Sequence, residues 1–191
     1  MSKKDFKNYN SYLKKTSYLG KFYRRYILYP KLLNYIKGDF FDIGCGLGDF
    51  LSLGSNKSIG IDINPFNIEY CIKRGLNAKI IANQVFPLED NSFNNAVLDQ
   101  VLEHIKDPKY LLKETRRVLI KKGTLIVGVP CIAGYRRDPD HKLFYDLYKS
   151  TIVLKKYGFK VNNFFYYPFP FKIFGQFLSQ QSLYLICNSD Y

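Results

Sequence analysis

The stretch Asp42-Ile43-Gly44-Cys45-Gly46-Leu47-Gly48 has the residue types and spacing of a ligand-binding loop. Glycine adopts positive φ without steric cost and lets the backbone come close to a bound molecule. The apolar residues before this loop predict the end of a buried strand, and residues 48–54 predict a helix after it. A helix that follows such a turn offers unpaired N–H groups to a negatively charged ligand.

A second acidic residue, Asp62, follows the apolar run Ser58-Ile59-Gly60-Ile61. In βαβ nucleotide-binding folds, an acid at the tip of the second strand holds the ribose hydroxyls. The glycine spacing argues against a dinucleotide as the ligand. Asp49 stands where the G-x-G-x-x-G fingerprint would have its third glycine.

The order acid-x-G-x-G-x-G, formed by Asp42, Gly44, Gly46 and Gly48, resembles motif I of the class I S-adenosylmethionine-dependent methyltransferases. The resemblance implies that the loop binds S-adenosylmethionine, with Asp42 accepting from the methionine ammonium group and S-adenosylhomocysteine as the product. The alternative is a degenerate nucleotide fold that keeps the loop only for structure.

Three further stretches are similar to the type-11 and type-23 methyltransferase groups. Residues 82–88 (ANQVFPL) resemble a G-D-A-x-L-P-F run, and the resemblance implies that Asn83 accepts from the adenine amino group. Residues 102–105 (LEHI) resemble an L-E-H-[VIL] signature after strand four, which implies that Asp99 and Gln100 face the methionine end of the cofactor. Residues 129–130 (VP) and 141–145 (HKLFY) are similar to the V-P after strand five and the later H-x-x-F-[YT] of the same groups. The remaining cofactor contacts that we assign to this resemblance are Cys45, Ile63 and Gln84.

Three residues are candidates for a catalytic base. Methyl transfer from a sulfonium is an in-line displacement that mainly requires alignment, and a hydroxyl acceptor benefits from a positioned base. His141 lies in the loop 131–145, which we expect over the substrate pocket at the carboxyl edge of the sheet. Its alternative role is packing or capping, because residues 138–141 also predict a turn before a helix. Asp99 and His104 are the other candidates, although the family's histidine at His104 mostly packs behind the cofactor.

No spacing in the sequence indicates a metal site, so we expect metal-independent transfer. The four cysteines are scattered and predict reduced thiols in a cytoplasmic protein. No apolar run approaches the roughly 18 residues of a membrane span, and the N-terminus carries no apolar signal region.

Strands and helices are predicted to alternate after residue 38. We expect strands near 39–43, 58–62, 79–82, 94–99 and 123–129, helices near 48–54, 66–74, 108–120 and 146–157, and two final β runs at 159–167 and 182–187. This pattern predicts an α/β fold with a Rossmann-like, doubly wound, mostly parallel sheet. A C-terminal antiparallel β-hairpin is how the class I methyltransferase fold ends.

The N-terminal residues 5–37 are predicted to be helical, with aromatic side chains interleaved among basic ones. Tyr18, Phe22 and Tyr26 would form one face, which the spacing of Phe22 and Tyr29 would extend. A second helix, residues 31–36, would begin after Pro30 and end before Gly38. We therefore expect one domain, residues 1–191, with a basic aromatic helical cap (1–37) and a cofactor-binding core (38–191).

The net charge of +13 is concentrated at the two ends of the chain. Residues 1–37 carry ten basic side chains and one acidic, and residues 131–191 carry eight and four. Basic ends suit an anionic substrate, a membrane surface or nucleic acid, although an AT-rich coding bias would produce a similar composition. The aromatic run 164–174 suits sugar rings and lipid tails, or a packed insertion that contacts a second copy in a homodimer.

These observations predict methyl transfer to a small molecule, a glycan or a lipid-linked saccharide, at a hydroxyl oxygen. We expect a cytoplasmic protein. The basic and aromatic ends extend this expectation to contact with the inner membrane surface. The alternatives are an RNA methyltransferase that uses the basic N-terminal segment and a non-catalytic cofactor-binding protein.

Overall fold

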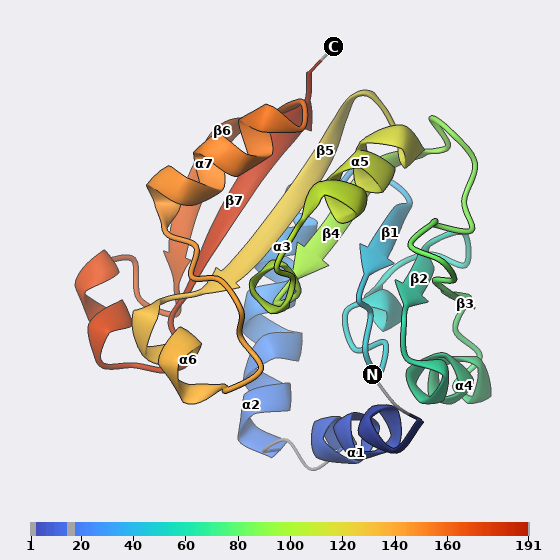
Figure 1. The fold of residues 1–191 in the computed structure, drawn as a ribbon, viewed down its shortest axis with the longest axis horizontal. Coiled ribbons are helices and arrows are strands. Elements are labelled where there is room, and N and C mark those ends of the chain that lie inside the picture. Colours follow the sequence, from blue (N-terminus) through green and yellow to red (C-terminus); the bar gives the residue numbers. More distant parts are fainter. Residues whose placement is uncertain (1–2, 15–17, 191) are drawn as a thin grey trace. The chain divides into compact units, whose positions relative to one another are not determined.

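The computed structural model describes residues 3–14 and 18–190, which cluster into two compact units. Unit 1 comprises residues 1–88 and unit 2 comprises residues 89–191. Figure 1 shows the helices and strands of both units. The single domain expected from the sequence stays a prediction.

The N-terminal part of unit 1 is helical, as predicted. It contains α1 (Lys3–Lys14), α2 (Tyr18–Tyr23), the π-helical turn η1 (Arg24–Leu28) and α3 (Tyr29–Leu33). Pro30 lies in the first turn of α3. The prediction of a helix over 31–36 was wrong in its bounds, because α3 continues directly from η1 and ends at Leu33.

The predicted aromatic face is present only in part. The Phe22 and Tyr26 rings pack at 4.6 Å between centroids, and both side chains are exposed. The side chain of Tyr18 lies outside the described residues. Tyr29 is buried, so its predicted pairing with exposed Phe22 on one face was wrong. The physical reason is η1, whose wider π turn rotates the residues after it away from regular helical spacing.

The sheet of unit 1 consists of three parallel strands in the order β3-β2-β1. These are β1 (Phe40–Ile43), β2 (Ile59–Asp62) and β3 (Ala78–Ile80), with α4 (Pro65–Lys73) between the last two. Every residue of β1 and β2 is buried, as expected for parallel strands that are covered on both faces. The three strands and α4 lie within two residues of their predicted bounds.

The helix predicted over 48–54 is absent, and this part of the prediction was wrong. The segment contains only the 3₁₀ turn η2 (Leu51–Leu53). Gly44, Gly46 and Gly48 all adopt positive φ, and Gly54 is already extended, so too few residues remain for a regular helix. An anion cradle at a helix N-terminus therefore does not exist here, and ligand binding must rely on the loop itself.

Unit 2 contains four strands in the order β4-β5-β7-β6. β4 (Phe93–Asp99) and β5 (Leu119–Pro130) are parallel, whereas β7 (Ser182–Ser189) is antiparallel to both β5 and β6 (Phe159–Tyr167). The described residues thus provide seven strands, mostly parallel with antiparallel C-terminal strands. The predicted Rossmann-like α/β class with its C-terminal hairpin is confirmed.

The helices of unit 2 are α5 (Lys109–Val118), α6 (Ile132–Arg137) and α7 (Leu147–Lys156), with 3₁₀ turns η3 (Leu102–His104) and η4 (Lys172–Gln176). The sequence placed α6 inside a loop and began β5 four residues too late. β5 starts early because Leu119 is already extended and pairs with Phe93. No described helix is long and apolar enough to cross a membrane. All four cysteines are free and buried, as predicted for reduced thiols.

Candidate functional site

The glycine-rich loop of unit 1 is tied to the end of β2 by backbone hydrogen bonds. The N–H groups of Gly44 and Cys45 both donate to the carbonyl of Ile61, at 2.7 and 3.2 Å. Gly44, Gly46 and Gly48 have φ of 69°, 54° and 76°, a region that side chains other than glycine rarely occupy. The loop therefore has the conformation that the sequence predicted from its glycines.

Asp62 holds this loop from the end of β2. Its carboxylate is only 6% exposed and accepts from Gly46 N at 2.9 Å, Asn64 N at 2.7 Å and the Asn67 side chain at 3.1 Å. Burial raises the pKa of Asp62, and the N–H donors oppose that shift by stabilising the charged form. The carboxylate thus joins the glycine loop to the start of α4. Its contact with ribose hydroxyls stays a prediction.

Two glycines allow the loop to pack against α4 and its following turn. A Cβ on Gly48 would lie 2.5 Å from Leu76 Cδ1 and 2.9 Å from Cys71 Sγ. A Cβ on Gly60 would lie 2.7 Å from Cys45 Sγ. The Cys71 thiol donates to Gly46 O at 3.4 Å. The loop backbone and the two thiols therefore form a close-packed layer that excludes larger residues.

Helix α1 packs over the same region of unit 1. The buried Asn10 side chain donates to Asn67 Oδ1 at 2.9 Å, and Asn64 Nδ2 donates to Phe6 O at 2.9 Å. Leu13 Cδ1 would be 3.6 Å from a Cβ on Gly46. Sequence reasoning missed these asparagines, and the Asn64-Pro65 pair, which begins α4, was the available signal.

Three of the predicted cofactor contacts are exposed in turns of unit 1. Ile63 is 54% exposed directly after Asp62. Asn83 and Gln84 are exposed and have positive φ of 52° and 62°. Such conformations cost free energy in non-glycine residues and concentrate at binding sites. These side chains are accessible to a ligand, as their predicted role requires.

Asp99 and Gln100 lie at the end of β4 in unit 2. Asp99 Oδ1 accepts from the Tyr184 hydroxyl at 3.1 Å, and Gln100, whose φ is 58°, donates to Ser182 Oγ at 3.3 Å. Gly128 leaves room for this pair, since a Cβ there would lie 2.4 Å from Asp99 Oδ1. Tyr184 and Ser182 were missed because pairing of β5 with β7 brings them here from the far end of the chain.

His141, Glu103 and His104 form a cluster in unit 2, in which Glu103 is buried and both histidine residues are partly exposed. The His141 side chain is 8% exposed, and its Nδ1 lies 2.8 Å from Tyr135 O. Its Nε2 lies 3.8 Å from Glu103 Oε1, and its ring packs edge-on against His104 at 4.7 Å between centroids. Burial and the nearby His141 lower the pKa of His104. The assignment of a catalytic base to either histidine stays a prediction, and the packing of His141 favours its alternative, structural role.

A cavity of about 170 Å³ lies in unit 2 beside the segment 131–145. Its walls come from this segment, at Cys131 and Phe144, and from the C-terminal part of the chain, at Tyr166, Lys172 and Leu183. Burial raises the pKa of Tyr145, which also lines it, to about 12, so this phenol is neutral at pH 7.

Residues 41–127 match a family model described as a methyltransferase domain. The matched residues therefore resemble a methyltransferase domain. This stretch contains the glycine loop, Asp62, Asn83 and Asp99, so the resemblance stated from the motifs is confirmed.

Two relatives are uncharacterized proteins of Methanocaldococcus jannaschii. One is 34% identical over 150 residues, covering 72% of this chain and 64% of the relative. The other is 33% identical over 93 residues, covering 49% of this chain and 45% of the relative. The chain therefore spans less than two thirds of the length of either relative.

Solved structures share the fold of the methyltransferase domain. The complex between the Haloferax volcanii Trm112 methyltransferase activator and a putative methyltransferase contains a chain with a TM-score of 0.78 and 14% identity, covering 100% of this chain and 98% of that one. An S-adenosylmethionine-dependent methyltransferase from Archaeoglobus fulgidus has a TM-score of 0.67 and 19% identity, covering 90% and 100%.

The methyltransferase family implies S-adenosylmethionine as the cofactor, and unit 1 fits this molecule. Positive φ at the loop glycines permits close backbone approach, exposed Ile63 offers an apolar surface to a purine, and exposed Asn83 offers an amide oxygen. The oxygens of Asp62 accept from protein N–H groups, so this residue holds the loop in place.

Proposed function

We propose that this chain transfers a methyl group from S-adenosylmethionine to a hydroxyl oxygen of a small molecule or glycan, with a lipid-linked saccharide as the favoured acceptor. The observation that carries the proposal is the glycine loop, which lies within the methyltransferase domain and has three positive-φ glycines held by Asp62. When bound, the cofactor supplies an electrophilic methyl group on a sulfonium.

In this proposal, different residues of the methyltransferase domain bind different parts of the cofactor. The backbone of residues 44–48 and Asp42 hold the methionine part, with Asp99 and Gln100 as further contacts to it. Ile63, Asn83 and Gln84 hold the adenosine part. Transfer then needs alignment of the acceptor, exclusion of water and a base for the hydroxyl proton, so no metal is needed at the reacting atoms. Asp99, His104 and His141 are the proposed bases.

The acceptor site in this proposal is the cavity of unit 2. Aromatic side chains, Phe144 and Tyr166, supply flat surfaces on which a sugar ring packs, and Lys172 supplies a positive charge for a phosphate. Both the segment 131–145, which we expect over the substrate pocket, and the C-terminal segment contribute walls, which supports this proposal.

The first experiment is a calorimetric titration with S-adenosylhomocysteine, followed by an acceptor screen with labelled methyl donor. We expect a dissociation constant on the order of micromolar, because the loop and adenosine contacts are preformed. No binding at millimolar ligand would contradict the proposal. Binding without transfer to any fraction of an extract would instead support the non-catalytic alternative.

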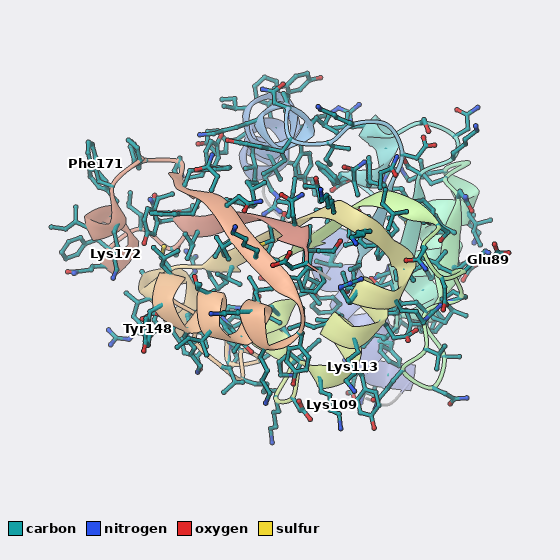
Figure 2. All side chains as sticks on the ribbon, turned by 90° about the horizontal axis from the view of Figure 1, so that it is seen from above. Glu89, Lys109, Lys113, Tyr148, Phe171 and Lys172 are labelled. Atoms are coloured by element: carbon teal, nitrogen blue, oxygen red, sulfur yellow. The ribbon has the colours of Figure 1, made fainter. Side chains whose placement is uncertain are left out.

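A lipid-linked acceptor is supported by an exposed apolar surface around η4. Its members are Phe164, Phe169, Phe171, Ile173 and Phe177. Figure 2 shows Phe171 and the neighbouring Lys172 projecting outward from the ribbon at one tip. Apolar side chains beside a lysine suit the boundary between headgroups and acyl chains of an anionic membrane.

Flotation with vesicles tests this surface. We expect the chain to float with vesicles containing anionic lipid, and the double variant Phe171→Ser/Phe177→Ser to lose at least about tenfold in partitioning, since two aromatic side chains no longer enter the bilayer. Tyr148→Ser, which removes an exposed aromatic residue on α7, is the matched control (Figure 2). Equal flotation of all three proteins would contradict membrane contact, and dimer dissociation by the double variant would point to the homodimer contact instead.

RNA methylation remains the second candidate function, and one observation favours it. Exposed Phe22 and Tyr26 pack together beside Arg25 and Lys21 in α2 and η1, as in stacking surfaces for single-stranded RNA. This alternative requires RNA binding whose affinity falls steeply with salt. Absence of binding at low salt would remove it.

A further inference from the structure

We propose that Glu103, His104 and His141 bind a divalent transition-metal ion of the Zn²⁺ class, which holds the segment 131–145 onto η3. The ion has a positioning role in this proposal and does not contact the methyl group. The inference stands independently of methyl transfer, because it rests on the side chains of unit 2 alone.

The three side chains bring their ligand atoms into one small volume. One atom from each, a carboxylate oxygen and two imidazole nitrogens, all lie within 4.8 Å of one another. In a tetrahedral site with metal–ligand distances of about 2.1 Å, ligand atoms lie about 3.4 Å apart. Ligand atoms at the upper limit of the observed spacing would therefore have to approach one another by about 1.4 Å to hold the ion.

His141 is oriented as metal-binding histidines usually are. His141 Nδ1 lies 2.8 Å from Tyr135 O, and since a carbonyl only accepts, this nitrogen carries the proton. A backbone carbonyl on one ring nitrogen fixes the tautomer and leaves the lone pair of the other nitrogen available to a metal.

The surroundings of His141 Nε2 are negative. Glu103 Oε1 lies at 3.8 Å and Asp138 Oδ2 at 3.9 Å, and the Glu103 side chain is 1% exposed. Two carboxylates beside an imidazole lone pair stabilise a cation that is bound among these three groups.

The donor set indicates the class of ion. Two imidazole nitrogens and one carboxylate suit Zn²⁺ and its neighbours, whereas Mg²⁺ and Ca²⁺ prefer oxygen. The backbone supports a positioning role, because Glu103 O accepts from Lys142 N at 2.7 Å and from Leu143 N at 3.1 Å. An ion on the Glu103 side chain would strengthen the same junction. His141 Nε2 cannot be both a metal ligand and a catalytic base. A measurement of zinc binding therefore also decides between those roles.

The test uses untagged full-length chain, stripped with chelator, reloaded with ZnCl₂ and dialysed. We expect about one equivalent of zinc by mass spectrometry and a rise in Tm of about 5–10 °C at zinc near 100 times its dissociation constant. Glu103→Gln, which keeps the shape of the side chain, should reduce bound zinc at least about tenfold and abolish the Tm rise. His141→Asn should do the same.

Glu89→Gln is the matched control, because it removes an exposed carboxylate of the same unit (Figure 2) and should leave zinc binding unchanged. Melting in chelator shows whether each variant is folded, and Glu103→Gln carries the test if His141→Asn does not fold. Zinc binding far below one equivalent would overturn the proposal. Undiminished binding in Glu103→Gln would also overturn it, by placing the ion elsewhere.

Discussion

Replacing Asp62 with alanine is expected to destabilise the protein by about 3–5 kcal/mol and to weaken S-adenosylhomocysteine binding by more than about 100-fold. The buried carboxylate accepts from Gly46 N, Asn64 N and the Asn67 side chain. Alanine would leave these three donors without an acceptor in a buried place, at about 1–3 kcal/mol each before relaxation. The glycine loop would then lose its link to α4.

Urea denaturation and calorimetry measure the two effects. Asp49→Asn is the matched control, because this exposed carboxylate beside the loop should change stability by less than about 0.5 kcal/mol. A folded Asp62→Ala with unchanged ligand affinity would contradict the role of Asp62 in holding the site.

Asp62→Asn separates the two roles of this residue. If the carboxylate also binds the ribose, 2′-deoxy-S-adenosylhomocysteine should bind the wild type more weakly than the full ligand, and the variant should lose this preference. If Asp62 only holds the loop, the preference for the 2′-hydroxyl should be the same in both proteins.

Replacing Gly48 with alanine is expected to cost about 2–4 kcal/mol of stability and to reduce cofactor binding strongly. Two costs in stability add. A residue with a Cβ is strained at a φ of 76°. The new Cβ would also overlap its neighbours, at 2.5 Å from Leu76 Cδ1 and 2.9 Å from Cys71 Sγ. Relief of the contact would move the loop, which the cofactor contacts in our proposal.

Gly75→Ala is the control for backbone strain. Gly75 has nearly the same φ, 74°, but no atom within 4 Å of an added Cβ. The Gly75→Ala variant should lose only the stability that backbone strain costs, about 1–2 kcal/mol, and should keep its affinity for the ligand. Equal losses in both variants would show that the packing of Gly48 against Leu76 and Cys71 contributes nothing.

Local residue patterns predicted most of the secondary structure correctly. Apolar runs bounded by glycine, proline and asparagine located the strands and α4, because side-chain periodicity and turn chemistry act over a few residues. The same reasoning failed after the glycine loop, at the π turn before Tyr29 and at α6. In each case a local preference was outweighed by the backbone conformation or packing of neighbouring segments.

The sequence by itself determined the class of fold, the glycine loop and the cofactor family, since these depend on residue types at fixed short spacing. The tertiary structure decided what those residues touch. Asp62 faces the loop and α4, Tyr184 reaches Asp99 through strand pairing, and His141 meets Glu103 and His104 although the segments are far apart in the sequence. Such contacts arise from packing over long chain separations, which spacing in one sequence does not encode.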